Sequence, residues 1–456
     1  MATGYVQSLY ALGASVVDAA VAWRGVGGRL TKIDGTPPTL RPLAAHRDGA
    51  LMTVPSPDSL DAFGRARVST VDPLWVMKHT FDANPDLMVT KVDNVASTAA
   101  YDSATASVIM TTRAAANGRV VRQSRQYIPY QPGRSHLIFA TFLFGSAVAN
   151  VTRQVGLFDD SNGVFFQQNG TTNLRFVVRK GASDTATAQS SWNLDKLDGT
   201  GSSGITLDVT KVQLLVIDLA WLGVGQVRFG FNISGRTIWC HASQTANSGT
   251  SVYMASPSLP IRWEINNNAA TSSNTMSEIC GAVFSEGGGD PSTGFPLAAS
   301  TSLIFPAGMS ITPAANSRAL LTAVRLKTAY TRAQLIPHAF EAVTTSAGTC
   351  AIELWLAPET AFATVPAAGV WVSLSTATEG APGNAAGWGA FTTTSARLLA
   401  STLVSNSTRS SATVTQQDLR VGADVDGVRD YLVLATYDLG SRPTVAGAEL
   451  ELLEVY

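Results

Sequence analysis

Residues 192–231 read WNLDKLDGTGSSGITLDVTKVQLLVIDLAWLGVGQVRFGF, and this stretch carries the clearest structural signal in the chain. An apolar run at 212–222 is followed by a glycine turn and then by 226–231, where apolar residues alternate with others. An apolar run, a tight glycine turn and a strand with a period of two residues predict a β-hairpin. The run at 212–222 is too apolar for a surface strand, so we expect both of its faces to be buried in the middle of a sheet sandwich.

Strand signals continue on both sides of this hairpin, with no helical period between them. In residues 61–295 the predicted strands are 119–128, 135–144, 151–158, 164–168, 174–179, 233–242, 261–265 and 276–284. After the glycine-rich loop at 285–292, the predicted strands are 320–326, 333–342, 350–356, 370–374, 431–437 and 450–456, with a polar Ser/Thr stretch at 405–415 between them. Many short strands predict an all-β fold with two antiparallel, jelly-roll-like β-sandwich domains, 61–295 and a smaller one at 296–456.

Residues 1–60 differ from the rest because glycines and prolines interrupt the apolar patterns after Arg24. Proline removes an amide donor and restricts the residue before it, so we expect an extended N-terminal arm rather than part of a core. Such an arm becomes ordered by lying on another subunit or another protein, and a flexible tail is the alternative. Arg65 and Arg67 would point to one side of a strand, where an interface ion pair is favoured over a carboxylate clamp.

The composition of the 456-residue chain limits its partners. Charged residues make up 14 %, against about 25 % in an ordinary soluble domain, and the net charge is −1. A nucleic-acid-binding protein carries a concentrated basic face, so we expect no nucleic-acid partner. A surface with so little charge suits contacts between subunits, and we expect a homo-oligomer, with a trimer as one option; a neutral monomer is the alternative.

The sequence indicates no membrane segment, metal site or cofactor site. No run of about 18 apolar residues occurs, and the apolar part of the N-terminus lacks the preceding basic segment of a signal peptide. The histidines and cysteines do not form ligand motifs, and we expect single structural histidines and buried thiols. They are His46, His79, His136, His241, His338, Cys240, Cys280 and Cys350.

Acidic residues give three sequence pairs, Asp159 with Asp160, Asp195 with Asp198, and Asp424 with Asp426. The last pair precedes a glycine as in a calcium loop but lacks the terminal Glu, so calcium binding is a weak alternative. Glycoside hydrolysis needs two carboxyls about 5–10 Å apart, which sequence spacing cannot establish. We therefore predict no catalytic residue. A glycan-active enzyme would lose turnover on alanine substitution of Asp195, Asp198, Asp424 or Asp426.

Tryptophans are spread over both predicted domains, at Trp192, Trp221, Trp239, Trp263, Trp355, Trp371 and Trp388. A carbohydrate-binding sandwich would expose some of them on one face. Tryptophan in alternating strands is more often part of the core, because large aromatic side chains dominate core packing, and we expect core positions here.

Four motifs stand out between residues 55 and 295. They are DAFGR at 61–65 with RVS at 67–69, WNLDKLDG at 192–199, WLGVG at 221–225 with RFGF at 228–231, and SEGG at 285–288. In these motifs the chain resembles a family of virion structural proteins encoded by tailed bacteriophages. The resemblance implies a non-enzymatic, jelly-roll-type component that is assembled in the host cytoplasm and located in the virion.

The favoured hypothesis is a head-attached decoration, minor capsid or head-fibre protein that stabilises the particle or projects a β-domain. Its arm would bind other virion proteins, either the major capsid protein or tail proteins. One alternative is a tail-fibre or baseplate component that binds a host-surface glycan; the other is the glycan-active enzyme. An exposed aromatic groove on residues 300–456 would favour receptor binding, whereas a flat apolar surface there would favour cementing of the particle.

Overall fold

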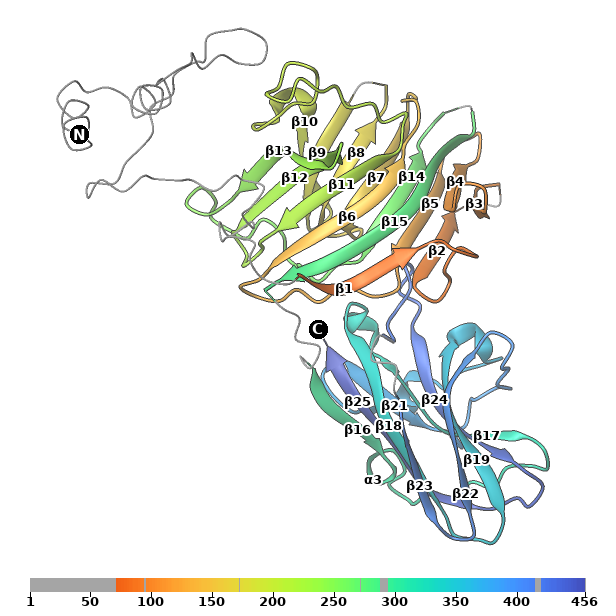
Figure 1. Cartoon of the computed structure of the whole chain (residues 1–456). Helices are drawn as coiled ribbons and strands as arrows, with labels where there is room; N and C mark the ends of the chain where they lie inside the picture. Colours follow the sequence, from red (N-terminus) through yellow and green to blue (C-terminus); the bar gives the residue numbers. More distant parts are fainter. Residues whose placement is uncertain are drawn as a thin grey trace, which may run out of the picture. The chain divides into compact units, whose positions relative to one another are not determined.

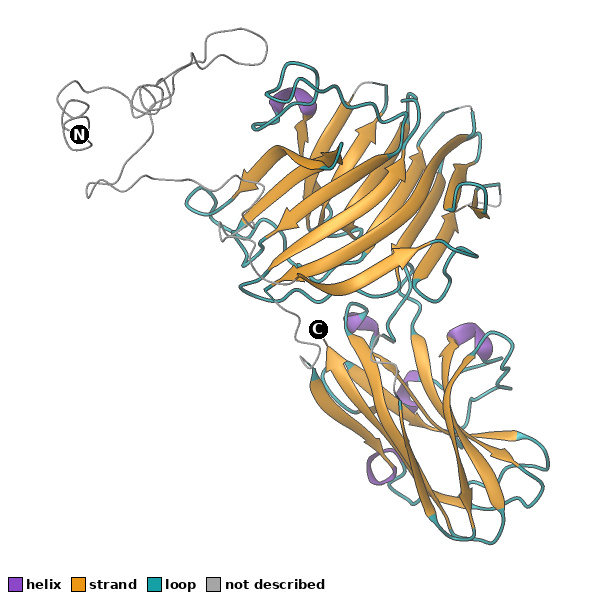
Figure 2. Ribbon diagram, viewed as in Figure 1, coloured by secondary structure: helices purple, strands orange, loops and turns teal. Residues whose placement is uncertain are grey.

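The computed structural model describes residues 71–455 apart from 94–95, 172, 271, 288–293 and 415–419. The predicted arm, Arg65, Arg67 and His46 lie outside the described residues. The described chain is all-β, as predicted (Figure 2). Its helices are single turns, namely η2 (Gln189–Ser191), α3 (Thr301–Ile304), η3 (Thr328–Tyr330), η4 (Glu359–Ala361) and η5 (Ala368–Val370). Within this part of the chain, no helix is long and apolar enough to cross a membrane.

The first sandwich consists of two sheets whose neighbouring strands all run antiparallel (Figure 1). One sheet has the order β13 (Arg236–Gln244), β12 (Gln226–Ile233), β11 (Gln213–Leu219), β6 (Ser135–Leu143), β15 (Asn274–Glu286), β4 (Ser107–Thr112) and β3 (Thr98–Asp102), and β1 (Val71–Lys78) also pairs with β15. The other has the order β10 (Ser183–Ala188), β9 (Asn173–Lys180), β8 (Gly163–Asn169), β7 (Val151–Phe158), β14 (Ile261–Asn267), β5 (Gly118–Ser124) and β2 (Met88–Asp93).

Large aromatic side chains from both sheets form the core of this sandwich. Phe142 of β6 and Phe229 of β12 come from one sheet, and Phe166 of β8 and Trp263 of β14 come from the other. All four are fully buried, and the ring centroids of Phe142 and Phe166 lie 5.8 Å apart across the interface. Packing of the two inner faces over one apolar core confirms the predicted antiparallel sandwich.

Strand β11 occupies the central position that its apolar sequence predicts. It lies between β6 and β12. Leu215 and Ile217 face the main core, while Val216 belongs to a separate apolar cluster on the other face of the sheet. The hairpin turn depends on Gly225, because a Cβ atom there would lie 1.9 Å from the carbonyl oxygen of Ala220. The predicted hairpin is confirmed, and double burial is confirmed for residues 215–220, whereas Val212 and Leu222 at the ends of the run are exposed.

The prediction was wrong where apolar pattern and backbone geometry disagreed. The expected strand at 233–242 is divided, because Ser234 and Gly235 have φ values of 54° and 77° and form a tight turn between β12 and β13. The predicted ranges in this sandwich began at residue 119 and so missed β1 to β4. They also missed β10, whose sequence SDTATA contains no large apolar residue. Strand β10 is the last strand of its sheet and pairs only with β9, so it has no second neighbour that would select for apolar side chains.

The second sandwich also contains two antiparallel sheets. The four-stranded sheet has the order β16 (Phe295–Ser300), β25 (Val445–Val455), β18 (Gln334–Thr344) and β23 (Arg409–Thr413). The six-stranded sheet has the order β20 (Val372–Ser373), β21 (Thr378–Pro382), β17 (Arg318–Leu326), β24 (Asp430–Asp438), β19 (Thr349–Pro358) and β22 (Arg397–Ser405). The polar stretch at 405–415 was wrongly placed between strands, because it contains β23, which pairs with β18.

Strand β24 is buried on both faces and separates two apolar clusters. Leu432 and Leu434 pack into the core between the two sheets. Tyr431, Val433 and Ala435 point to the opposite side, where loops cover a second cluster that contains several aromatic rings. This double burial fits the uninterrupted apolar run at 431–435, whereas the sequence alone did not indicate what covers the outer face.

The strands of the first sandwich end at Glu286, the last residue of β15, and those of the second begin at Phe295, the first residue of β16. The loop that the sequence indicates as a boundary lies between these two strands, and its residues 288–293 are outside the described part. No strand in the described ranges pairs with a strand of the other sandwich. The limits of the three predicted segments, 1–60, 61–295 and 296–456, stay predictions.

Candidate functional site

The carboxylate of Asp195 has a structural role inside the glycine-rich loop of the first sandwich. Its oxygens accept hydrogen bonds from the amides of Leu197 (2.9 Å) and Ser203 (2.7 Å) and from the hydroxyl of Ser202 (3.1 Å). Gly201 is required at its position, since a Cβ atom would lie 2.1 Å from Oδ1 of Asp195. Burial alone would raise the pKa of Asp195, but these donors lower it below its usual value. The loop therefore closes around an ionised carboxylate.

Asp198 binds its own turn in a similar way. It accepts hydrogen bonds from the amide of Thr200 (2.9 Å) and from its hydroxyl (2.6 Å). These bonds, the hydroxyl first, lower the pKa of Asp198. Neither Asp195 nor Asp198 is prepared as a general acid, which needs a raised pKa.

Asp424 and Asp426 lie in a tight turn before β24. Asp424 accepts hydrogen bonds from the amides of Asp426 (2.9 Å) and Val428 (2.8 Å). Gly427 has a φ of 77°, which suits glycine, and Asp426 forms an ion pair with Lys91. Asp424 thus stabilises its own turn, and the pattern that resembled part of a calcium loop has a local structural explanation.

Asp159 and Asp160, the third acidic pair, also bind neighbouring groups. Asp159 accepts hydrogen bonds from the amides of Ser161 (2.8 Å) and Asn162 (2.7 Å). Asp160 pairs with Arg119 (2.6 Å) and Arg262 (2.8 Å). Burial opposes ionisation of Asp160, but the two arginines lower its pKa. All three acidic pairs are thus used in turns or ion pairs.

Most of the described histidines and cysteines are buried or partly buried. His79 is buried with Nε2 3.4 Å from Glu278, and burial lowers the pKa of His136 to about 4. The three thiols form no disulfide, and burial raises the pKa of each. Among the residues that the structure describes, no group of three or more His, Cys, Asp and Glu side chains is placed to hold a metal ion.

Most tryptophans that the sequence assigned to the core are there. Those with buried side chains are Trp192, Trp239, Trp263, Trp355 and Trp371. Trp221 and Trp388 are partly exposed. Trp388 is of interest because it lines a pocket on the second sandwich.

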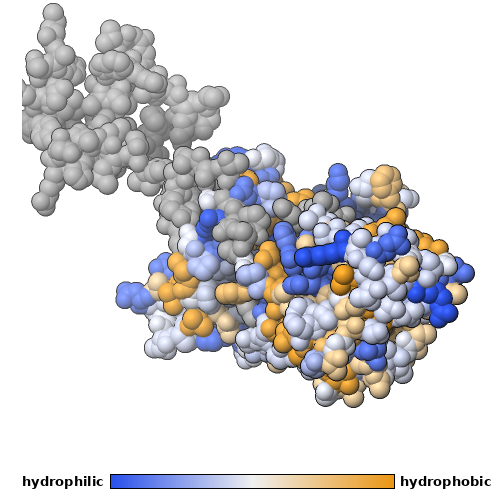
Figure 3. Space-filling view, turned by 90° about the horizontal axis from the view of Figure 1, so that it is seen from below, coloured by the Kyte–Doolittle hydropathy of each residue, from blue (hydrophilic) through white to orange (hydrophobic). Residues whose placement is uncertain are grey.

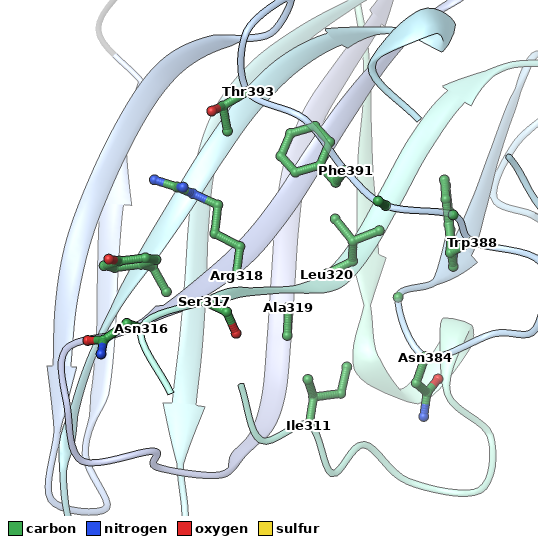
Figure 4. Close-up of a pocket in the computed structure, with 14 residues that line it drawn as sticks. Ile311, Asn316, Ser317, Arg318, Ala319, Leu320, Asn384, Trp388, Phe391 and Thr393 are labelled. Atoms are coloured by element: carbon green, nitrogen blue, oxygen red, sulfur yellow. The ribbon is translucent and has the colours of Figure 1, made fainter. Parts of the chain in front are cut away.

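This pocket, which we call the aromatic pocket, has a volume of about 590 Å³ (Figure 4). Its size falls within the range of small-molecule sites, about 300–1,000 Å³. The pocket is formed by the first residues of β17, by the loop between β21 and β22, and by one residue of β24. The lining residues with polar, charged or aromatic side chains are Asn316, Ser317, Arg318, Asn384, Trp388, Phe391, Thr393 and Tyr437.

The loop that forms one wall of the aromatic pocket is fixed by backbone hydrogen bonds. The amide of Gly383 binds the carbonyl of Leu321 (2.9 Å), and the amide of Gly389 binds the carbonyl of Thr364 (2.9 Å). Both glycines are needed, because a Cβ at Gly383 would lie 2.1 Å from the carbonyl oxygen of Leu320 and one at Gly389 would lie 2.5 Å from the amide nitrogen of Thr364. The indole of Trp388 is oriented by its own hydrogen bond, to the carbonyl of Pro382 at 2.8 Å.

The charge in the aromatic pocket is compensated locally. Arg318 donates to Glu353 through Nε (2.6 Å) and Nη2 (3.2 Å), so that the guanidinium and carboxylate form a two-point pair. The guanidinium carbon also lies 5.2 Å from the ring centre of Trp355 and 4.8 Å from that of Tyr437. The pocket therefore presents aromatic surface and neutral polar groups rather than an uncompensated charge.

The aromatic pocket was not predicted as a site. The sequence did contain a signal, GNAAGWGAF at 383–391, in which closely spaced glycines surround aromatic residues. The other contributors, Arg318 and Tyr437, are far away in the sequence. From the sequence, an aromatic groove on residues 300–456 was considered only as a feature that would favour receptor binding.

No protein-family model and no curated protein matches the chain. Among solved structures, the chain is similar to the Emp47p carbohydrate recognition domain (10 % identity, 48 % of this chain and 97 % of that chain, TM-score 0.31). It is also similar to peanut lectin (9 % identity, 48 % of this chain and 98 % of that chain, TM-score 0.30). A third similar structure is a β-1,3-glucanase from Mycobacterium marinum (11 % identity, 47 % of this chain and 100 % of that chain, TM-score 0.30). Similarities this distant do not bear on what the chain binds or does.

Proposed function

We propose that this chain is a non-enzymatic structural protein of a tailed-phage virion. The observation that carries the proposal is the loop around Asp195. The motif WNLDKLDG at 192–199, which resembles the phage virion family, folds into a closed loop whose carboxylates accept hydrogen bonds from neighbouring turn residues. A carboxylate that stabilises its own loop supports a structural role for this motif.

The packing of the sheets supports a role as a rigid building block. Strands β11 and β24 are buried on both faces, one in each sandwich. Burial of apolar surface contributes about 25 cal/mol per Å², so doubly buried strands stabilise each sandwich strongly. In this proposal the arm, residues 1–60, binds the major capsid protein or a tail protein, and copies of the chain associate as a homo-oligomer.

The first candidate position is the head, where the chain would act as a decoration, minor capsid or head-fibre protein. The second candidate is a tail fibre or baseplate component that binds the host surface. The aromatic pocket on the second sandwich favours this second candidate. On the face that Figure 3 shows, polar and apolar residues are intermixed, which also suits a projecting domain. A glycan-active enzyme is less favoured, since the described acidic pairs stabilise turns or form ion pairs.

Immunogold labelling of intact particles of the encoding phage tests the proposal. The antibody is raised against residues 296–456, and particles that lack the protein serve as the control. Label over the head supports the decoration or head-fibre role, and label at the tail or its tip supports the host-binding role. Purified particles that contain the protein in neither place would contradict the virion proposal.

A further inference from the structure

We propose that the aromatic pocket binds a neutral carbohydrate unit through an aromatic platform and two side-chain amides. The inference rests on the second candidate of the proposed function, binding to the host surface, and deepens it by naming the ligand class of a particular site. Binding by the purified chain and location in the particle are separate measurements, so failure of one proposal is distinguishable from failure of the other.

Phe391 supplies the platform. One side of its ring packs on Phe362, with centroids 5.2 Å apart and planes at 28°, and the ring forms a T-shaped contact with Trp355 at 6.0 Å and 78°. The ring is only partly buried, and it lines the pocket together with Leu320 and Trp388 (Figure 4). The face of an aromatic ring carries partial negative charge and attracts the polarised C–H groups that cover one face of a sugar ring.

Polar side chains surround this apolar surface. In Figure 4, Asn316 and Asn384 lie on opposite sides of Leu320, and Thr393 lies near Arg318. Within the described residues, no hydrogen bond uses the side-chain amide of Asn316 or of Asn384, and both residues are exposed. An amide group both donates and accepts hydrogen bonds, as a sugar hydroxyl does, so the two groups are complementary.

The charge of the pocket selects a neutral ligand. Because Glu353 is 7 % exposed and holds two nitrogens of Arg318, the guanidinium charge is already compensated. An acidic sugar would have to compete with this carboxylate for the guanidinium, and separation of a partly buried ion pair is costly. A neutral hexose or N-acetylhexosamine needs no such exchange.

The pocket is also formed before a ligand arrives. The backbone hydrogen bonds of Gly383 and Gly389 fix the loop against the residues beneath it. The packing of Phe391 on two other rings holds the platform in place. Ordering of loops and side chains opposes binding, so a site that is already ordered loses less free energy when a weakly held ligand binds.

The test measures sugar binding by the full chain with calorimetry and ligand-observed NMR. The probes are glucose, galactose, mannose and N-acetylglucosamine, with galacturonic acid and N-acetylneuraminic acid as acidic counterparts, at up to about 10 mM. The variants are Phe391→Ala and Asn384→Ala. Phe81→Ala is the matched control, because Phe81 is 90 % exposed and lies in the first sandwich.

We expect binding of at least one neutral sugar, and a loss of about tenfold or more with Phe391→Ala, which corresponds to about 1.4 kcal/mol. Phe391→Tyr should restore it, and the control should bind as the parent does. Phe391→Ala also removes packing, so Asn384→Ala, which breaks no hydrogen bond of the fold, gives the independent result of a severalfold loss. No binding of any neutral sugar by the parent chain, preference for the acidic sugars, or full binding by both variants would overturn the proposal.

Discussion

The glycine-rich loop at 195–204 in the first sandwich encloses a carboxylate, whereas the glycine-rich loop at 383–391 in the second leaves aromatic rings at an open pocket. In the first loop, Gly201 makes room for the side chain of Asp195 within the loop itself. In the second, Gly383 and Gly389 allow the loop to approach other backbone segments. Glycine thus allows the first loop to close around its own side chain and the second loop to pack against neighbouring backbone segments. The role of a glycine depends on what the fold brings next to it.

The largest effect should come from Asp195→Ala, which removes the acceptor at the centre of the first loop. Three donors, on Leu197, Ser202 and Ser203, would lose their partner. The amide of Leu197 is buried and would be left unsatisfied, which costs about 1–3 kcal/mol, whereas Ser202 and Ser203 are exposed and can bond to water. We therefore expect a total loss of about 2 kcal/mol in the free energy of unfolding. Urea unfolding measures it, with Asp198→Ala as a control of little effect. Equal stability of the two variants would show that the first loop is not closed around Asp195.

In the second loop, Gly383→Ala should affect the pocket more than the fold. The added Cβ would lie 2.1 Å from the carbonyl oxygen of Leu320, so the loop must shift, at a cost of about 1–2 kcal/mol. We expect a loss of sugar binding of at least about tenfold, together with a modest fall in melting temperature. Gly369→Ala is the control, because a Cβ there meets open space. If the Gly383→Ala variant binds sugar normally, the pocket does not depend on the attachment of the second loop to the sheet. The contrast between the two glycine-rich loops would then be wrong.

A smaller effect is expected on acidification. The pKa of Asp195 is lowered in the folded chain, against the opposing effect of burial, and an unfolded aspartate titrates at about 3.9. The stabilisation is therefore fully present above about pH 4 and is lost as the pH falls through the lower folded value. Comparison of the parent with Asp195→Asn by thermal unfolding between about pH 2 and 7 isolates this contribution. If both lose stability in parallel, other carboxylates account for the acid sensitivity.

Deletion of residues 1–55 should have the smallest effect on the fold. We expect a soluble protein whose circular dichroism spectrum and melting temperature match those of the full chain, because we predict that the arm lies outside both sandwich cores. The same variant should fail to join the virion when it is supplied to particles that lack the protein. Misfolding of the variant would mean that the arm completes a core, and normal incorporation would mean that attachment uses another surface.

Several strands with apolar signals were predicted, but the apolar strands β1, β4 and β22 were not among the predicted ranges, and the polar strand β10 was also missed. The apolar run at 212–222 contains β11, the first strand of the hairpin. Apolar side chains on both faces of a strand favour a position that is buried on both faces. Strand β10, with sequence SDTATA, could not be recognised, since its pairing with β9 is a backbone interaction that leaves no apolar pattern. The turn at Ser234–Gly235 was missed because the flanking apolar residues gave the appearance of one continuous strand.

The sequence by itself determined the all-β class and the hairpin at 212–231, because alternation of apolar residues and a glycine turn act over a few neighbouring positions. It also indicated two sandwiches and a chain with few catalytic candidates. Only the tertiary structure decided that Asp195 closes its loop and that Arg318, Phe391 and Tyr437 meet at one pocket. These residues come from β17, a loop and β24, and which distant segments become neighbours depends on strand order and packing rather than on local pattern.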